Sequence, residues 1–133
     1  MNLQSLELSH YKVLIVDDVP LNVLLVEKML YQFSFNVRTA ANGLEAMREI
    51  IADKPDLVLL DLMMPVMDGF EVIRTVREDP ALNEVKIIAL SALNNNEDIV
   101  RAYDLGVQDF ISKPITLEKL THSVATQLGI PLE

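Results

Sequence analysis

The sequence has no cysteine, four glycines and fewer basic than acidic residues. Without cysteine the chain forms no disulfide bond and no thiolate metal site. The four glycines build neither a Walker loop nor a dinucleotide-binding fingerprint, which argues against nucleotide binding. The 11 Lys and Arg residues against 20 Asp and Glu residues give a formal net charge of −9. This charge disfavours direct nucleic-acid binding, because such binding usually depends on basic patches.

Long hydrophobic runs are also missing, although 50% of the residues are hydrophobic. No apolar run approaches the ~18 residues of a membrane span, so we expect no membrane insertion. The segment Met1–His10 has no basic cluster followed by an apolar core, as a secretory signal would. We therefore expect a cytoplasmic location. His10 and His122 lie near opposite ends of the chain without metal-ligand spacing, and are predicted to be solvated.

Short apolar runs alternate along the chain with segments of helical period. The runs are nearly continuous in Val, Ile and Leu, as in strands that are covered on both faces of a parallel sheet. The predicted strands are 12–17, 35–39, 56–60, 85–90 and 107–111. Repeated strand–helix units with right-handed crossovers predict one α/β domain, an open doubly wound sheet with helices on both faces. We place this domain at 12–128, with an N-terminal extension, 1–11, and a C-terminal tail, 129–133.

The segments between and after the strands carry apolar residues at helical spacing. The predicted buried stripes are Val23, Val26, Leu30 and Phe33; Leu44, Met47 and Ile51; Val72, Ile73 and Val76; and Leu117, Leu120, Val124 and Leu128. The fourth helix, at about 95–105, is predicted to be the weakest because it has few apolar residues to bury. These are Ile99, Ala102 and Tyr103.

Capping signals agree with these helices. A side-chain acceptor followed by Glu three residues later marks a helix N-terminus. This pattern occurs at Asn42, Asp68 and Asn94. Thr116 is predicted to cap the last helix, and Gly106 to end the fourth in the left-handed conformation. Pro20 suits the first turn of the first helix, where its missing N–H costs nothing.

Charged and hydroxyl residues follow four of the predicted strands. They are Asp17, Asp18, Asp61, Ser91 and Lys113. In an open parallel sheet, ligands bind beyond the carboxyl ends of the strands, where the strand order reverses. Separate loops are therefore predicted to bring three carboxylates, a hydroxyl and an ammonium to one place. Each residue alone has a simpler interpretation, as a cap, a loop hydroxyl or a solvated charge, but their recurrence at successive strand ends favours a shared site.

The chemistry of this set points to phosphoryl transfer. Three neighbouring carboxylates repel one another, so either a pKa rises or a cation binds, and an all-oxygen set suits Mg²⁺. A carboxylate held against a divalent ion can attack phosphorus and form an acyl phosphate. Asp61 is the predicted nucleophile because it stands alone at the end of the central strand, whereas Asp17 and Asp18 suit metal binding. Lys113 would supply a fixed positive charge and Ser91 a hydroxyl donor.

These motifs resemble the receiver domain of two-component response regulators, from about Lys12 to Leu128. The matching segments are 16–18 (VDD) with Pro20 and Asn22, 61–69 (DLMMPVMDG), 89–92 (ALSA) and 110–114 (FISKP). The resemblance implies a flavodoxin-like (βα)5 fold with a five-stranded parallel sheet in the order 2-1-3-4-5. It also implies a signalling phosphoacceptor of a two-component system or phosphorelay rather than an enzyme, with intrinsic self-phosphorylation and autodephosphorylation chemistry.

The resemblance assigns a role to each residue of the set. Asp61 would accept the phosphoryl group, and the metal ligands would be Asp17, Asp18, Asp61 and the backbone carbonyl of Met63. The ion would be Mg²⁺, with Mn²⁺ as an alternative. Ser91 would donate its hydroxyl to the phosphoryl oxygens, and Lys113 would pair with them. In the family, the peptide bond that matches Lys113–Pro114 is commonly cis.

A switch and its partners are implied in the same way. Ser91 would move towards the phosphoryl group and Phe110 would rotate inward, although plain core packing of Phe110 is an equal alternative. The surface of the fourth helix, last strand and fifth helix would then change. Expected partners are a sensor histidine kinase or histidine phosphotransfer protein, and an effector domain or downstream protein. A homodimer formed on phosphorylation is a further option.

Met63 and Leu93 lie two residues after Asp61 and Ser91, at positions that flank the phosphoryl group in the family. Both are apolar and cannot orient a water molecule, so we predict a long-lived phosphoryl form. Met63 also argues against a phosphatase of the haloacid-dehalogenase type, which carries a general acid at that place. An interaction module without phosphorylation is disfavoured because every site position holds a competent residue. The short tail leaves two options open, a stand-alone regulator or a fragment of a longer response regulator or hybrid kinase.

Overall fold

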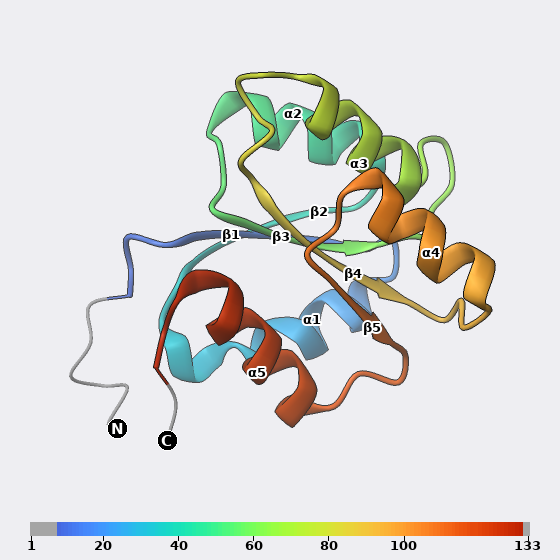
Figure 1. The fold of residues 1–133 in the computed structure, drawn as a ribbon. Coiled ribbons are helices and arrows are strands. Elements are labelled where there is room, and N and C mark those ends of the chain that lie inside the picture. The colour runs from blue at the N-terminus through green and yellow to red at the C-terminus, as the bar shows by residue number, and fades with distance from the viewer. Residues whose placement is uncertain (1–7, 132–133) are drawn as a thin grey trace.

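Five parallel strands form one sheet in the order β2-β1-β3-β4-β5 (Figure 1). The computed structural model describes residues 8–131. Residues 1–7 of the predicted extension and 132–133 of the predicted tail lie outside this range. The strands are β1 Lys12–Val16, β2 Asn36–Ala40, β3 Leu57–Asp61, β4 Lys86–Ser91 and β5 Asp109–Ser112. The flavodoxin-like architecture and the strand order are confirmed.

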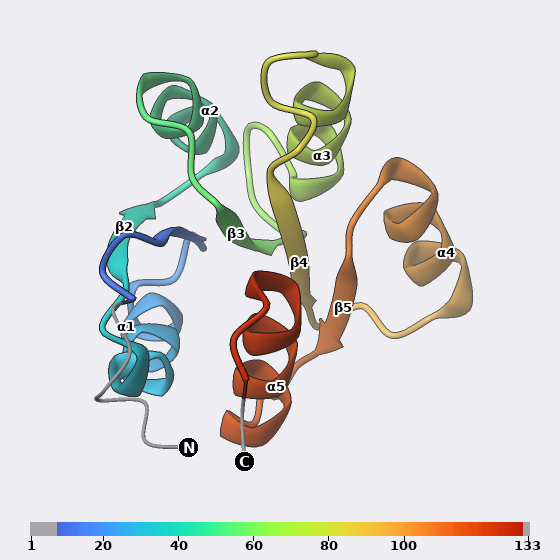
Figure 2. The ribbon, with the colours of Figure 1, turned by 60° about the vertical axis from the view of Figure 1, so that its left-hand side comes forward.

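Helices cover both faces of the sheet. They are α1 Pro20–Met29, the short 3-10 helix η2 Tyr31–Phe33, α2 Gly43–Ala52, α3 Gly69–Glu78, α4 Asn96–Leu105 and α5 Leu117–Leu128. Helices α1 and α5 lie on one face, and α2, α3 and α4 lie on the other (Figure 2). Within residues 8–131, no helix is both long enough and apolar enough to span a membrane.

The core is divided by the sheet into two hydrophobic clusters. Alternate residues of β1 belong to different clusters, with Val13 and Ile15 facing α1 and α5, and Leu14 and Val16 facing the other helices. Every residue of β3 is buried. The continuous apolar runs of the sequence thus have their cause in burial on both faces. Leu8, in the predicted extension, also packs in the cluster on the α1 and α5 face.

Not every predicted helix face is correct. Val72, Ile73 and Val76 of α3 are fully buried, as predicted. In α2 the predicted stripe is right at Met47 but wrong at Leu44 and Ile51, which are exposed by 47% and 68%. The buried residues of α2 are Gly43, Ala46, Met47 and Ile50.

Close packing at Gly43 explains why α2 buries a different face from the predicted one. A side chain there would collide with the Met67 carbonyl oxygen, so Gly43 lets the helix start press against the loop before α3. In α5, Leu120 and Val124 are buried as predicted, but Leu117, the first residue of the helix, is 54% exposed.

Most predicted caps are confirmed. Asn42, Asp68 and Thr116 each accept a hydrogen bond from the backbone N–H three residues later. Asn94 is wrong as a cap, since Asn95 accepts from the Asp98 N–H at 2.9 Å and its amide also donates to the Asp98 carboxylate. This second bond favours a helix start one residue later.

Two further predicted helix ends are confirmed, one in α4 and one in α1. Gly106 ends α4 with φ +114°, as predicted, and Pro20 is the first residue of α1. Strand β5 begins at Asp109 rather than at Val107, because the Val107 N–H still bonds the Ala102 carbonyl of α4. His10 and His122 are exposed.

Candidate functional site

Three carboxylates meet at the carboxyl edge of the sheet. Asp17 follows β1, Asp61 ends the neighbouring strand β3, and Asp18 comes next after Asp17. Each offers a carboxylate oxygen that lies within 4.8 Å of the other two. Asp17 and Asp61 are 5% and 4% exposed, whereas Asp18 faces solvent. Parallel pairing of β1 with β3 therefore brings together the acids that the sequence predicted to share a site.

Local hydrogen bonds fix the two buried acids. The Asp17 backbone N–H donates to the Ala40 carbonyl, which continues the pairing with β2. One oxygen of Asp17 accepts from the Val19 N–H at 2.9 Å, and one oxygen of Asp61 accepts from the Met63 N–H at 3.1 Å. These Asx turns use one oxygen of each carboxylate, and the other oxygen faces Lys113.

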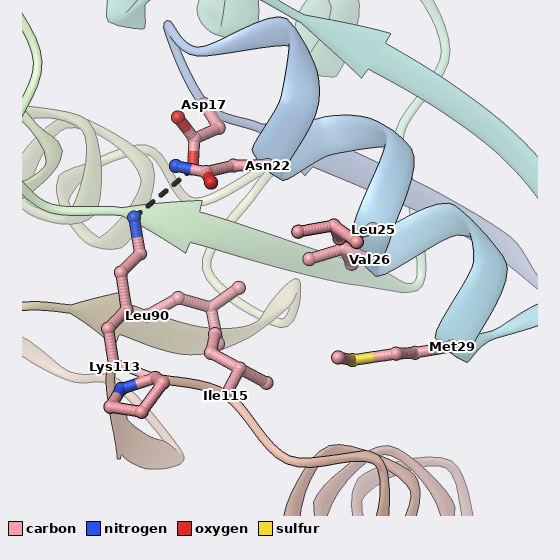
Figure 3. A pocket seen from close by; sticks show the side chains of 9 residues that line it. Asp17, Asn22, Leu25, Val26, Met29, Leu90, Lys113 and Ile115 are labelled. Atoms are coloured by element: carbon pink, nitrogen blue, oxygen red, sulfur yellow. Dashed lines mark hydrogen bonds and ion pairs between the residues drawn. The ribbon is translucent and has the colours of Figure 1, made fainter.

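Lys113 faces both buried carboxylates. Its ammonium nitrogen lies 3.3 Å from an oxygen of Asp17 (Figure 3). The same nitrogen lies 3.6 Å from an oxygen of Asp61. The Lys113 backbone N–H donates to the Ser91 carbonyl at 2.8 Å, and the bond to Pro114 is cis, as the resemblance implied. One cation thus serves two buried anions, and a third anion lies beside them.

This imbalance affects the ionisation of Asp61. Burial raises the pKa of Asp61 above its ordinary value of 3.8, and the charges of Asp17 and Asp18 raise it further. The Met63 N–H and the Lys113 ammonium lower the same pKa but do not cancel the effect of burial. A divalent cation would relieve the repulsion, and the all-oxygen donor set fits a hard ion such as Mg²⁺.

The remaining predicted residues lie around this centre. Ser91 ends β4, is fully buried and accepts a hydrogen bond from the Leu93 N–H at 3.0 Å. Leu93 and Phe110 are half-buried and pack against the hydrophobic cluster on the α2, α3 and α4 face. Met63 is 56% exposed. Ser91 therefore shares the edge with the acids, while its hydroxyl is held by its own loop.

A cavity of about 420 Å³ adjoins Asp17 and Lys113 and runs along α1 (Figure 3). Its lining includes Asn22, Leu25, Met29, Leu90 and Ile115. Sequence reasoning did not predict this cavity. Leu25, an apolar residue of α1 outside the predicted stripe, was the available signal, and it is 47% exposed.

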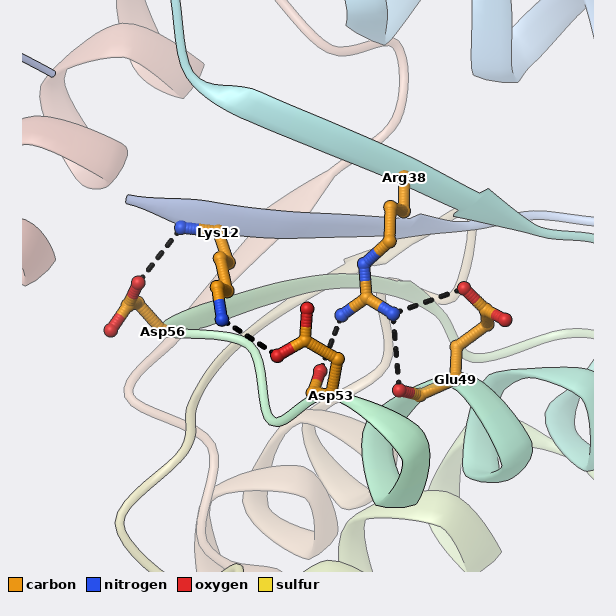
Figure 4. A network of polar contacts seen from close by, with 5 residues as sticks. All are labelled: Lys12, Arg38, Glu49, Asp53 and Asp56. Atoms are coloured by element: carbon orange, nitrogen blue, oxygen red, sulfur yellow. Dashed lines mark hydrogen bonds and ion pairs between the residues drawn. The ribbon is translucent and has the colours of Figure 1, made fainter. Parts of the chain in front are cut away.

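A second charged network lies at the opposite, amino edge of the sheet (Figure 4). Arg38 donates to the Glu49 carboxylate at 3.0 Å, to the Glu49 carbonyl at 3.2 Å and to the Asp53 carbonyl. The Lys12 ammonium lies 2.7 Å from Asp53, and the Lys12 N–H donates to Asp56. A hydrogen bond from Lys12 lowers the pKa of Asp53, the reverse of the shift at Asp61.

Fold and site together define a doubly wound α/β domain with an acidic cluster and a lysine at its carboxyl edge. The sequence profile described as the response regulator receiver domain matches residues 13–125. The chain belongs to this family, the receiver domains of two-component systems.

Relatives of known sequence are longer proteins. The chain is 38% identical over 104 residues to the response regulator PleD of Caulobacter vibrioides, covering 78% of this chain and 23% of PleD. It is 41% identical over 110 residues to hybrid signal transduction histidine kinase L of Dictyostelium discoideum, covering 78% of this chain and 6% of that protein. The chain thus spans less than a quarter of either relative.

Solved structures agree with the assignment. The receiver domain of a signal transduction histidine kinase from Syntrophus aciditrophicus is 32% identical, with a TM-score of 0.83 and 90% of each chain covered. The receiver domain of sensor histidine kinase PA1611 from Pseudomonas aeruginosa is 29% identical, with a TM-score of 0.82 over 90% of this chain and 98% of that one. The latter holds a magnesium ion in its active-site cleft.

Proposed function

We propose that this receiver domain accepts a phosphoryl group on Asp61 from a phosphohistidine, in a reaction that depends on Mg²⁺. The observation that carries the proposal is the cluster of Asp17, Asp18 and Asp61 oxygens within 4.8 Å, with the Lys113 ammonium 3.6 Å from Asp61. A buried acid whose charge the protein neutralises incompletely is suited to bind a cation or react with a ligand from solution.

The metal ligands would be one oxygen each of Asp17, Asp18 and Asp61, with the backbone carbonyl of Met63. When bound, Mg²⁺, or Mn²⁺ in its place, would supply positive charge that offsets the repulsion between Asp61 and the incoming phosphoryl oxygens. The oxygen donors and the surplus of carboxylates over cations at this edge support this assignment.

In the transfer step, a carboxylate oxygen of Asp61 forms the O–P bond as the P–N bond of the phosphohistidine breaks. The electron pair of that bond leaves with the imidazole nitrogen. The Lys113 ammonium would move from the carboxylates to the phosphoryl oxygens. This movement would be short, because the ammonium already lies beside Asp17 and Asp61. Ser91 would release the Leu93 N–H and donate its hydroxyl to the same oxygens. Placement of charge does most of the work in such a transition state.

The donor would be a sensor histidine kinase or a histidine phosphotransfer protein. The output surface would be α4, β5 and α5, where Phe110 would respond to Ser91. Its half-buried ring is compatible with inward rotation. An effector domain, a downstream protein or a second phosphorylated copy would bind there. The histidine kinases among the similar proteins support a place in a cytoplasmic phosphorelay.

Intact-mass analysis after incubation with acetyl phosphate and Mg²⁺ tests the proposal. The wild type is expected to gain one phosphoryl group, and Asp61→Asn none. Asp53→Asn is the matched control, because it removes a carboxylate from the amino edge and should leave the adduct unchanged. An unmodified wild type, or an equal adduct on Asp61→Asn, would contradict the proposal.

A further inference from the structure

Helix α4 is held in place by little apolar burial. Ala102 is its single buried side chain, whereas α3 buries five residues. Val100 and Tyr103 are 55% and 45% exposed. Since burial of apolar area is the usual source of helix docking energy, other contacts must fix the position of α4.

Arg77 of α3 supplies such contacts at one end of α4. Its Nε donates to the Gly106 carbonyl at 2.8 Å, and one terminal nitrogen donates to the carbonyls of Asn83 and Val85 at 3.0 and 2.6 Å. The other terminal nitrogen donates to the Gln108 side chain at 2.9 Å. One guanidinium therefore joins α3, the loop before β4 and the turn between α4 and β5.

The partners of Arg77 are neutral and firmly placed. The side-chain Oε1 of Gln108, which accepts from Arg77, also accepts from the Ile87 N–H of β4 at 2.7 Å. Gly106 is required here twice, for its φ of +114° and because a Cβ would lie 2.8 Å from the Arg77 Nε. Arg77 forms no ion pair with any residue in 8–131, and burial lowers its pKa. Its role is positional rather than electrostatic.

A second contact fixes the same end of α4. The Tyr103 hydroxyl donates to Asp109 of β5 at 3.3 Å, and the other Asp109 oxygen accepts from Ser123 of α5. Through Tyr103 and Gly106, the C-terminal half of α4 is therefore bonded to α3, β5 and, indirectly, α5.

The N-terminal half of α4 has different contacts. Within the described chain, side chains of 96–100 form no hydrogen bond to another helix or strand, and the Asn95–Asp98 cap is internal. The ring contact of Arg101 over Phe70, at 4.1 Å, lies near the middle of the helix. The N-terminal half follows Ser91 by only a few residues, and the Leu93 N–H is bonded to the Ser91 hydroxyl.

We infer that α4 turns about a fixed pivot at its C-terminal end, built by Arg77 on Gly106, when Ser91 engages the phosphoryl group. The inference rests on the proposed function. Movement of Ser91 breaks its bond to Leu93 and shifts the start of α4, which has few contacts to resist. The several hydrogen bonds of Arg77 keep the C-terminal end in place, so α4 rotates about that end instead of moving as a whole. Arg77 is a positioning residue for the switch.

Amide hydrogen exchange followed by mass spectrometry tests the pivot in the full chain. On incubation with acetyl phosphate and Mg²⁺, exchange in peptides covering 93–100 is expected to change by about tenfold, and in 103–108 by less than about twofold. Equal changes along α4, or the larger change at 103–108, would overturn the pivot.

Arg77→Lys and Arg74→Lys form a matched pair on α3. Both keep the charge, but Arg74 is exposed and pairs on the surface with Glu71 and Glu78. In Arg77→Lys, phosphorylation is expected to change exchange over 103–108 by about tenfold as well, whereas Arg74→Lys should behave as wild type. If Arg77→Lys kept the wild-type pattern, the pivot would be wrong.

Intact mass of the same samples separates the two proposals. A wild type that carries no adduct would defeat the proposed function. The pivot would then be judged on the unphosphorylated proteins, where Arg77→Lys should raise exchange at 103–108 about tenfold over wild type and Arg74→Lys should not. No difference between these two variants would overturn the pivot there too. Because Arg77 lies outside the acidic cluster, its variant is expected to form the Asp61 adduct normally.

Discussion

The two edges of the sheet carry similar charges in opposite arrangements. At the amino edge, Arg38 and Lys12 contact the acids and carbonyls around them (Figure 4). The side chains of both ion pairs are partly exposed. At the carboxyl edge, Lys113 is the one cation within residues 8–131 that pairs with Asp17 and Asp61, and both acids are buried. The first arrangement lowers the pKa of Asp53, and the second raises the pKa of Asp61.

The difference shows how one sheet separates stability from function. At the amino edge, charges that are paired within the protein hold α2 against β2 and are not available to bind a ligand. Charges that are buried with too few partners cost stability, and a cation or phosphoryl group from solution can compensate them. Changes at the carboxyl edge should therefore alter phosphorylation, and changes at the amino edge should alter stability without affecting phosphorylation.

Replacing a lysine at each edge should give the largest contrast. In Lys113→Met the initial rate of adduct formation with acetyl phosphate is expected to fall about 100-fold, because a charged group aimed at the transferring phosphoryl contributes about 2.7–4 kcal/mol. Lys12→Met, the matched control, should react at the wild-type rate. A time course of intact mass measures both, and equal rates would refute the role of Lys113.

Arg38→Met should affect stability instead. The substitution removes the Arg38 bond to the Asp53 carbonyl and one of the two bonds to the Glu49 carbonyl, which keeps the Asp53 N–H. We expect this loss to lower the free energy of unfolding by about 2 kcal/mol. Urea denaturation measures the change, and the folded variant should still be phosphorylated. A stable variant that no longer accepts phosphate would show that the two edges are not separable.

Asparagine substitutions should shift stability in opposite directions at the two edges. Because the pKa of Asp61 is raised in the folded protein, its ionised form weakens folding as pH rises from about 4 through the folded pKa. Asp61→Asn should therefore stabilise the metal-free protein at neutral pH by about 1 kcal/mol.

The pKa of Asp53 is lowered, so its contribution is present above its ordinary value of 3.8 and is lost as pH falls below that value. Asp53→Asn should slightly destabilise at neutral pH and lose this effect in acid. Denaturation curves of both variants from about pH 3 to about pH 7 give the two signs. Shifts of the same sign at neutral pH would contradict the comparison.

The smallest effect is expected at Met63. This exposed apolar side chain beside Asp61 cannot orient a water molecule, so the phosphoryl form should be long-lived. Met63→Asn should shorten its lifetime several-fold, a change of about 1 kcal/mol in the barrier. Decay of the adduct after removal of acetyl phosphate measures it. Loss of phosphate from the wild type within seconds would disprove the prediction.

Strand positions and site residues could be predicted because both depend on local sequence patterns. Continuous apolar runs indicate strands that are covered on both faces. An acid after such a run lies at the carboxyl edge of the sheet, however the helices pack. Asp17, Asp18, Asp61 and Lys113 therefore met as expected. The set of residues was also specific enough to indicate the family.

Features that depend on tertiary contact could not be predicted. The exposed Leu44 reflects how closely Gly43 approaches Met67, which no helical period encodes. The shift of a cap from Asn94 to Asn95 depends on a bond to Asp98. The contacts of Arg77 join segments that only the folded chain brings together, so an isolated arginine in α3 gave no sign of them.

The effect of Mg²⁺ on thermal unfolding tests the contrast between the two edges most directly. A ligand at about 100 times its Kd stabilises the protein that binds it by about 2.7 kcal/mol. Mg²⁺ is therefore expected to raise the unfolding midpoint of the wild type and of Asp53→Asn by the same amount, and to leave Asp17→Asn nearly unchanged. An equal rise in all three proteins, or none in the wild type, would contradict a cation site at the carboxyl edge.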